Sequence, residues 1–261
     1  MDIFTLNNMQ RTGLSDNYVS VVSKNDPPEC GITIPGDSLP SYGGDQNWFH
    51  EIAVSAMYPE IERRDFGSVT RNGCTLIAAT DFILYVLKYH AEITSEKIIT
   101  DDIASMDLYT YAERVMLWKK KYFEVLFSGL DNIQMQNGFN SFFKDHGIKL
   151  KCKASLFRLF DRAAVEKYLK NNIPVILSLR SNNPSGNRSL DFFTQEELLS
   201  GAAVSNKKCS INHTVNITGI IRDKNRIWLE ISSWGRKYYI DCAEFRAKCI
   251  QFNSMLYFSY K

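Results

Sequence analysis

The sequence predicts an α+β fold in which helices come first along the chain and antiparallel strands later. Apolar residues recur at helical spacing up to residue 147, and after Gly147 they form short apolar or alternating runs. Hydrophobic residues make up 44% of the 261 positions, which is ample for a sizeable core. We expect a helical part over about 46–147 and a strand-rich part over about 148–261. Residues 1–45, rich in Asn, Ser, Asp, Gly and Pro, predict an extended N-terminal arm.

In the helical part, the apolar spacing predicts four helices, at about 47–57, 74–91, 101–121 and 133–146. Ala79, Phe82 and Ile83 share one face of the second helix. Asp101 follows Thr100 as a helix start signal, and Gly147 suits a helix end.

In the strand-rich part, alternating or apolar runs predict six strands, at 148–154, 173–179, 211–222, 226–232, 236–241 and 253–260. Short helices are expected at 161–171, starting at Asp161, and at 241–249. Residues 181–210 form a long polar connection, and loops of that length are usually functional or mobile. We expect the active cleft between the helical and strand-rich halves.

The net charge of +2 and the scattered Lys and Arg argue against nucleic acid as a partner. No apolar run approaches the ~20 residues that span a bilayer, so no membrane partner is expected. The N-terminus lacks the basic and apolar regions of a secretory signal. Six Cys without a Cys-x-x-Cys pair suggest reduced thiols in a cytoplasmic protein, unless a leader was removed.

No Cys or His residues lie at the spacing that zinc ligands require. We therefore expect neither a metal nor an organic cofactor. The oligomeric state stays open.

Two short motifs suggest chemistry. Gly73-Cys74 opens an apolar helical stretch, so the thiol is expected in the first turn of a helix, where backbone N–H groups favour an anion. Asn212-His213 begins a predicted strand. The next strand closes with Ser232-Ser233-Trp234-Gly235. A histidine beside a cysteine takes its proton, and the imidazolium stabilises the thiolate nucleophile.

The ordered set of motifs resembles the papain-like cysteine peptidases, in particular bacterial-type members. In that family a Cys opens the central helix of one lobe and a His begins a strand of the other. The third catalytic residue, usually Asn, lies in an Asn-Ser-Trp-Gly segment. The resemblance implies a papain-like fold, with the Cys-bearing helical lobe packed against an antiparallel β-sheet lobe. It also implies Cys74 as nucleophile, His213 as general base and acid, and Ser232 at the position of the Asn.

The resemblance also implies an oxyanion hole, which the Cys74 N–H and a Gln upstream of the cysteine would form. The usual near position is Ser68, which does not match, so Gln46 in its Gly-rich turn is one candidate and Asn72 the other.

His213 needs a partner on its second ring nitrogen. Ser232 occupies the matching position, and Glu230 shares its strand face and is the alternative. Trp234 is expected to shield the pair from water, and Gly73 to support the start of the helix.

The sequence thus predicts a cysteine peptidase that acts on a peptide or isopeptide bond of a peptide or protein substrate. One alternative keeps the fold but changes the reaction, to a Cys-His acyltransferase or deamidase. A second alternative is a catalytically silent papain-like module that binds peptides.

Overall fold

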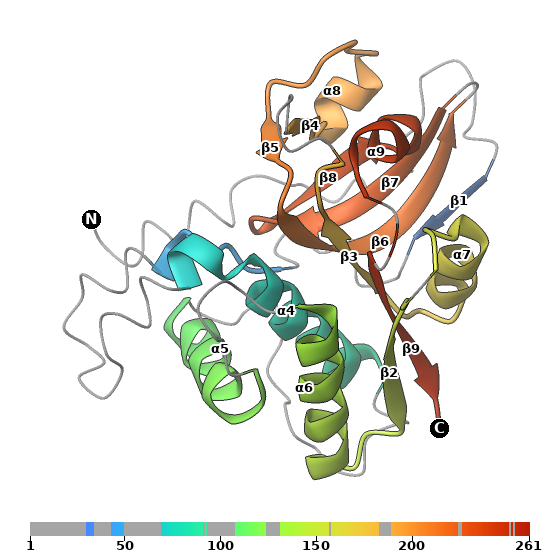
Figure 1. Cartoon of the computed structure of the whole chain (residues 1–261). Coiled ribbons are helices and arrows are strands. Elements are labelled where there is room, and N and C mark those ends of the chain that lie inside the picture. The colour runs from blue at the N-terminus through green and yellow to red at the C-terminus, as the bar shows by residue number, and fades with distance from the viewer. Residues whose placement is uncertain are drawn as a thin grey trace.

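The computed structural model describes residues 30–33, 43–49, 69–90, 92, 108–123, 131–156, 158–182, 189–223, 226–250, 252 and 254–261. These residues form an α+β structure in which helices cover an antiparallel sheet (Figure 1). The predicted α+β class with an antiparallel sheet is therefore confirmed.

The main sheet runs in the order β2-β9-β3-β6-β7-β8, and β1 also pairs with β6. Its strands are β1 (Cys30–Thr33), β2 (Leu150–Ala154), β3 (Val175–Leu179), β6 (His213–Asp223), β7 (Arg226–Ser233), β8 (Arg236–Asp241) and β9 (Met255–Tyr260). The first half of β6 pairs with β3 and its second half with β1 on the same side, while β7 lies on the other side. Part of the predicted extended arm is thus a strand of this sheet. The remainder of that arm up to residue 42 lies outside the described residues.

The helices α4 (Cys74–Tyr89), α5 (Leu108–Tyr122) and α6 (Asn132–Asp145) form a group beside the sheet (Figure 1). Residues 75–87 of α4 are all buried, as expected for a helix that is apolar all round. This group shares one hydrophobic core with β2 and β9. The prediction for 74–91 is confirmed to within two residues. Most of the helix predicted at 47–57, and the start of the one at 101–121, lie outside the described residues.

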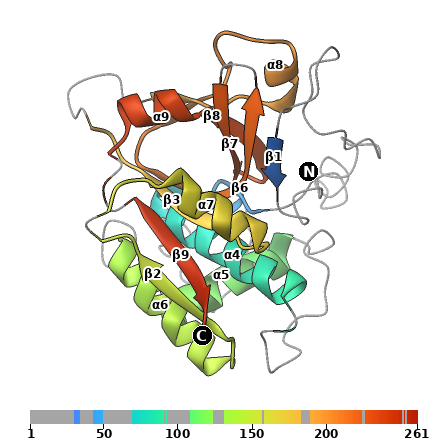
Figure 2. The same cartoon turned by 90° about the vertical axis from the view of Figure 1, so that its right-hand side faces the viewer.

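A second hydrophobic core lies on the opposite face of the sheet from α4. It contains Val215 and Ile217 of β6, together with Leu169 of α7 (Arg162–Lys170) and Phe245 of α9 (Cys242–Lys248). Figure 2 shows α7 and α9 on the side of the sheet away from α4 and α5. Both helices begin at an Asp whose side chain accepts backbone N–H bonds, as the sequence predicted for α7.

The connection predicted at 181–210 is more structured than expected. It contains a ribbon of β4 (Ser189–Asp191) and β5 (Lys208–Ser210), with α8 (Gln195–Leu199) between the two strands. Thr194 and Glu197 cap α8 reciprocally. The Thr-x-x-Glu spacing is a sequence signal of this helix start, although polar residues surround it on both sides.

Candidate active site

Cys74 is the first residue of α4, as predicted, and its side chain is partly exposed. The N–H of Gly73 donates to the carbonyl oxygen of Val69 at 2.7 Å. A Cβ at position 73 would lie 2.2 Å from that oxygen, so the close approach requires glycine. Residues 69–72 are themselves helical. The start of α4 is therefore a break between two helical stretches, rather than the isolated helix end that the sequence suggested.

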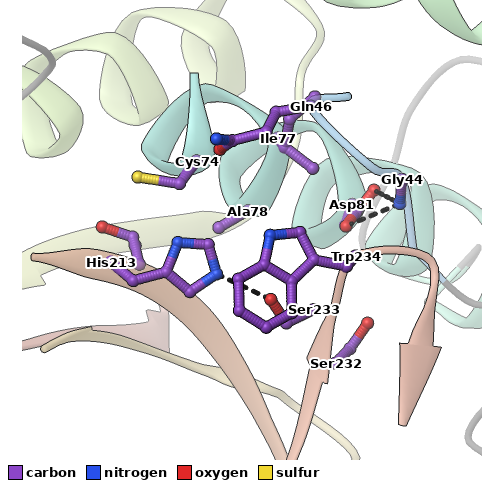
Figure 3. A pocket seen from close by; sticks show the side chains of 11 residues that line it. Gly44, Gln46, Cys74, Ile77, Ala78, Asp81, His213, Ser232, Ser233 and Trp234 are labelled. Carbon is purple, nitrogen blue, oxygen red and sulfur yellow. Dashed lines mark hydrogen bonds between the residues drawn. The ribbon is translucent and has the colours of Figure 1, made fainter. Parts of the chain in front are cut away.

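His213 is the first residue of β6, and it lines the same pocket as Cys74 (Figure 3). In this view the ring nitrogen Nδ1 lies on the edge of the imidazole that faces the cysteine. The chain thus brings together the two residues that the motifs selected, from a helix of one part and a strand of the other. Their pocket is lined by Gly44, Gln46, Cys74, Ile77, Ala78, Asp81, His213, Thr214, Ser232, Ser233 and Trp234.

Two hydrogen bonds fix the start of α4 against the start of β6. The hydroxyls of Thr75 and Thr214, which directly follow the cysteine and the histidine, are 3.0 Å apart. Three residues further along the helix, the Asn216 side chain donates to the carbonyl oxygen of Ala78, also at 3.0 Å. These bonds are buried and directional, so they restrain both the sliding and the rotation of α4 against β6.

The imidazole of His213 is buried in an aromatic and hydroxyl environment. Its Nε2 lies 2.7 Å from Oγ of Ser233. The indole of Trp234 stacks on the ring, with centroids 4.7 Å apart and planes 20° apart. Burial lowers the pKa of His213 to about 4, because the charged form loses its hydration. The ring is thus neutral at pH 7, which departs from the thiolate–imidazolium pair expected from the sequence.

The hydroxyl beside the histidine ring belongs to Ser233 and not to Ser232, which corrects the motif-based assignment. Successive side chains of a strand point to opposite faces, so only one of the two serines can face the ring. Glu230 lies on the same face as Ser232, where its carboxylate accepts from Thr218 at 3.3 Å and pairs with Lys237 at 3.5 Å. Glu230, the alternative orienting residue, is not among the residues that line the pocket.

Trp234 and Gly235 form the two-residue turn between β7 and β8. Both have positive φ, 49° and 66°, as a tight hairpin of this length requires. A bulky residue rarely adopts that conformation, and such outliers are concentrated at functional sites. Besides stacking on the histidine, the indole contacts Lys207, whose Nζ lies 4.6 Å from the ring centroid. Phe192 also packs on it, with centroids 5.3 Å apart.

The two oxyanion candidates have different positions. Gln46 lines the pocket, and its side chain extends toward Cys74 (Figure 3). Its Nε2 donates to the carbonyl oxygen of Thr70 at 3.1 Å, and its buried Oε1 has no partner among the described residues. Asn72 is exposed and is not among the residues that line the pocket. Of the two candidates, the structure therefore places only Gln46 at the pocket.

Sequence reasoning missed Asp81, which lines the inner end of the pocket and is 3% exposed. The signal was present, because Asp81 is the only charged residue among positions 75–87 of an otherwise apolar helix. It also lies seven residues after Cys74, two turns along the same helix face. Burial raises the pKa of its carboxyl to about 7.

Comparisons of the chain with protein-family models, with curated proteins and with solved structures found no match. Within the described part of the chain, no helix is long and apolar enough to cross a membrane. The same residues contain no group of three or more His, Cys, Asp or Glu side chains placed to hold a metal ion.

Proposed function

We propose that this protein is a cysteine peptidase of papain-like type, which hydrolyses a peptide or isopeptide bond with Cys74 as nucleophile and His213 as general base and acid. The observation that carries the proposal is the meeting of these two residues in one pocket, each at the first position of its element. The Thr75–Thr214 bond between their neighbours supports it, because it ties the two elements together where the chemistry would take place.

In the proposed reaction Sγ of Cys74 attacks the substrate carbonyl while Nδ1 of His213 takes the thiol proton. The C–N bond of the tetrahedral intermediate then breaks, and the same proton passes from Nδ1 to the leaving amine. Water attacks the resulting thioester and gives one proton to Nδ1. The C–S bond breaks, the acid product leaves, and the proton returns to the thiol.

The surroundings of His213 favour a neutral general base. With the proton on Nε2, that nitrogen donates to Oγ of Ser233 and leaves the Nδ1 lone pair on the cysteine side. Because burial lowers the pKa of the ring to about 4, proton transfer would accompany the attack of sulfur rather than precede it. Ser233 is then a neutral positioning residue with the role that Asn usually has in the resembled family, one position after the matching Ser232.

The oxyanion of the tetrahedral intermediate needs preorganised donors. Gln46 is the side chain suited to this role, because its Nε2 carries two hydrogens and Thr70 accepts only one of them. The backbone N–H of Cys74 is the second proposed donor. The donors would contribute on the order of 3 kcal/mol each, the magnitude found for one oxyanion-hole donor in other hydrolases.

The proposal is tested by thiol labelling followed by peptide turnover. Iodoacetamide at pH 7 should label Cys74 before Cys152, Cys209, Cys242 and Cys249, since burial raises the pKa of these four thiols. A mixed peptide library, analysed by mass spectrometry, should then be cleaved by the native chain. The Cys74→Ser and His213→Ala variants should leave the library intact.

A matched control is Cys152→Ala, which removes a buried thiol of β2 that does not line the pocket. It should cleave the library at the native rate. Cleavage that persists in Cys74→Ser would refute the proposal. Products that carry an added amine instead of water would identify an acyltransferase on the same site.

A catalytically silent peptide-binding module is the second candidate. It is favoured by the hydrogen bond from Gln46 to Thr70, which directs one of the amide hydrogens away from the pocket. In that case Cys74 would still be labelled, but no library peptide would be cut. A peptide retained equally by the native chain and by Cys74→Ser would then identify the module.

A further inference from the structure

The segment 43–49 carries Gln46, and its position depends on a buried carboxyl of α4. The N–H of Gly44 donates to both oxygens of Asp81, at 2.9 and 3.1 Å. The hydroxyl of Tyr111, on α5, donates to Oδ1 of the same carboxyl at 2.7 Å. Asp81 therefore joins three segments that are far apart in the sequence, and all three groups are buried.

The fit around Gly44 is too tight for any other residue. A Cβ at that position would lie 2.1 Å from the Tyr111 hydroxyl oxygen. On its other side, the Gly44 carbonyl accepts from the N–H of Gly235 at 3.0 Å, in the turn that contains Trp234. The contact with Tyr111 on one side and the hydrogen bond to Gly235 on the other together fix the position of the segment.

From this geometry we infer that Asp81 is a positioning residue of the active site, which acts through Gly44 to hold the Gln46 amide over Cys74. The inference has a structural part, that Asp81 fixes the segment, and this part stands on the hydrogen bonds alone. Its catalytic part, that the fixed Gln46 amide assists the reaction at Cys74, rests on the proposed function. The carboxyl accepts from two donors at once, and an amide in its place would direct N–H groups at one of them. Asp81→Asn should therefore release the segment although it changes the side-chain volume little.

The catalytic part is tested with p-nitrophenyl acetate. Cys74 Sγ bonds to the acetyl carbon, the ester C–O bond breaks, p-nitrophenolate leaves, and the thiol proton passes to His213. This step passes through an oxyanion, whereas alkylation by iodoacetamide does not. Gln46→Ala should slow acetylation of Cys74 by at least about a hundredfold and Asp81→Asn by about tenfold to a hundredfold, and both should leave iodoacetamide labelling within about twofold of native.

A double-mutant cycle shows whether Asp81 acts through Gln46. The variant with both Gln46→Ala and Asp81→Asn should be no slower in acetylation than the slower single variant, because the same interaction is lost in each. The inference would be overturned if the fold-losses in acetylation rate of the two single variants multiplied in the double variant. It would also be overturned if Asp81→Asn were acetylated at the native rate.

Tyr111→Phe removes one donor from the same carboxyl and keeps the apolar ring, so it is the milder second variant. It should slow acetylation severalfold. Tyr122→Phe is its matched control, since Tyr122 lies on the same helix and donates to a different carboxyl, Asp145, at 3.1 Å. Acetylation in Tyr122→Phe should equal that of the native chain. Equal losses in the two tyrosine variants would overturn the inference.

Hydrogen exchange separates failure of this inference from failure of the proposed function. The peptide that contains residues 44–49 should exchange at least tenfold faster in Asp81→Asn than in the native chain and in Tyr122→Phe. Unchanged exchange would overturn the structural part. Faster exchange in a chain whose Cys74 is not acetylated at all would uphold the positioning of the segment and refute the peptidase proposal, together with the catalytic part of this inference.

Discussion

The two faces of strand β6 are held in different ways. Toward α4, the strand presents polar side chains, and two of them, Thr214 and Asn216, bond to the helix. Toward α7 and α9, it presents Val215 and Ile217, which pack in an apolar core. Apolar packing is strong but not directional, whereas a hydrogen bond fixes distance and angle. The difference suggests that the apolar face supplies most of the stability, and that the polar face sets where Cys74 lies relative to His213.

The largest expected effect comes from the apolar face. Ile217→Ala should lower the free energy of unfolding by about 2–5 kcal/mol, because it leaves a cavity in a fully buried site. The rate of Cys74 labelling per folded molecule should stay near native, since the α4–β6 bonds are unchanged. Urea unfolding and labelling at low urea measure the two quantities. A large loss of labelling with little loss of stability would contradict the comparison.

Two buried titratable groups of the pocket, His213 on β6 and Asp81 on α4, shift the free energy of unfolding in opposite directions with pH. Burial lowers the pKa of His213 from 6.5 to about 4, so the folded chain binds fewer protons and stability rises with pH between those values. Burial raises the pKa of Asp81 from 3.8 to about 7, so the folded chain binds more protons and stability falls over that range.

Replacing either group should expose the contribution of the other. Between pH 4 and 6.5, the free energy of unfolding of Asp81→Asn should rise relative to that of the native chain, by on the order of 3 kcal/mol. The free energy of unfolding of His213→Gln should fall relative to that of the native chain over the same interval. Urea midpoints at four or five pH values measure both trends. Parallel pH curves for the native chain and the two variants would show that neither pKa is shifted.

The adjacent serines of β7 provide a smaller and more local comparison. Ser233→Ala removes the hydroxyl beside Nε2 of His213 and should slow acetylation of Cys74 roughly threefold to tenfold, the equivalent of about one hydrogen bond. Ser232→Ala, on the opposite face, should have the smaller effect. The reverse order would restore Ser232 as the residue that orients the histidine.

The smallest change expected is that of Thr75→Val, which removes one hydroxyl and keeps the shape of the side chain. It should lower the free energy of unfolding by about 0.5–1.5 kcal/mol. It should also slow acetylation by p-nitrophenyl acetate more than Ile217→Ala does, although it costs less stability. Equal effects of the two variants on acetylation would show that hydrogen bonding on the polar face does not position the site.

The sequence predicted the elements with strong periodicity and the site residues that are local to a motif. Helix α4 and strands β6 to β8 follow directly from apolar spacing, and the motifs placed Cys74 and His213 at the starts of their elements. The motif does not determine which of the two adjacent serines of β7 faces the histidine, because a shift of one residue moves a side chain to the opposite face of the strand. In the structure Ser233, and not Ser232, faces the histidine.

Contacts between distant segments left no local signal. The strand β1 pairs with residues 219–222 of β6, and no pattern near residue 30 indicates such a partner. Likewise, the bond between Asp81 and the N–H of Gly44 involves a backbone group, and a backbone group is the same at every position of the chain except proline. A charged residue in an apolar helix indicates that some partner exists but does not identify it.

The hydrogen bond between Gly44 and Gly235 has a consequence for the order of events during synthesis. The pocket needs residues 44, 74, 213 and 235 together, so a growing chain lacks it until the β7–β8 turn has left the ribosome. Long loops must close before such contacts form, which makes this the slow part of folding. Until then a nascent chain has the Cys74 thiol without the complete pocket on which the proposed function depends. The reactivity that the proposed function requires therefore depends on the β7–β8 turn as much as on the helix that carries the thiol.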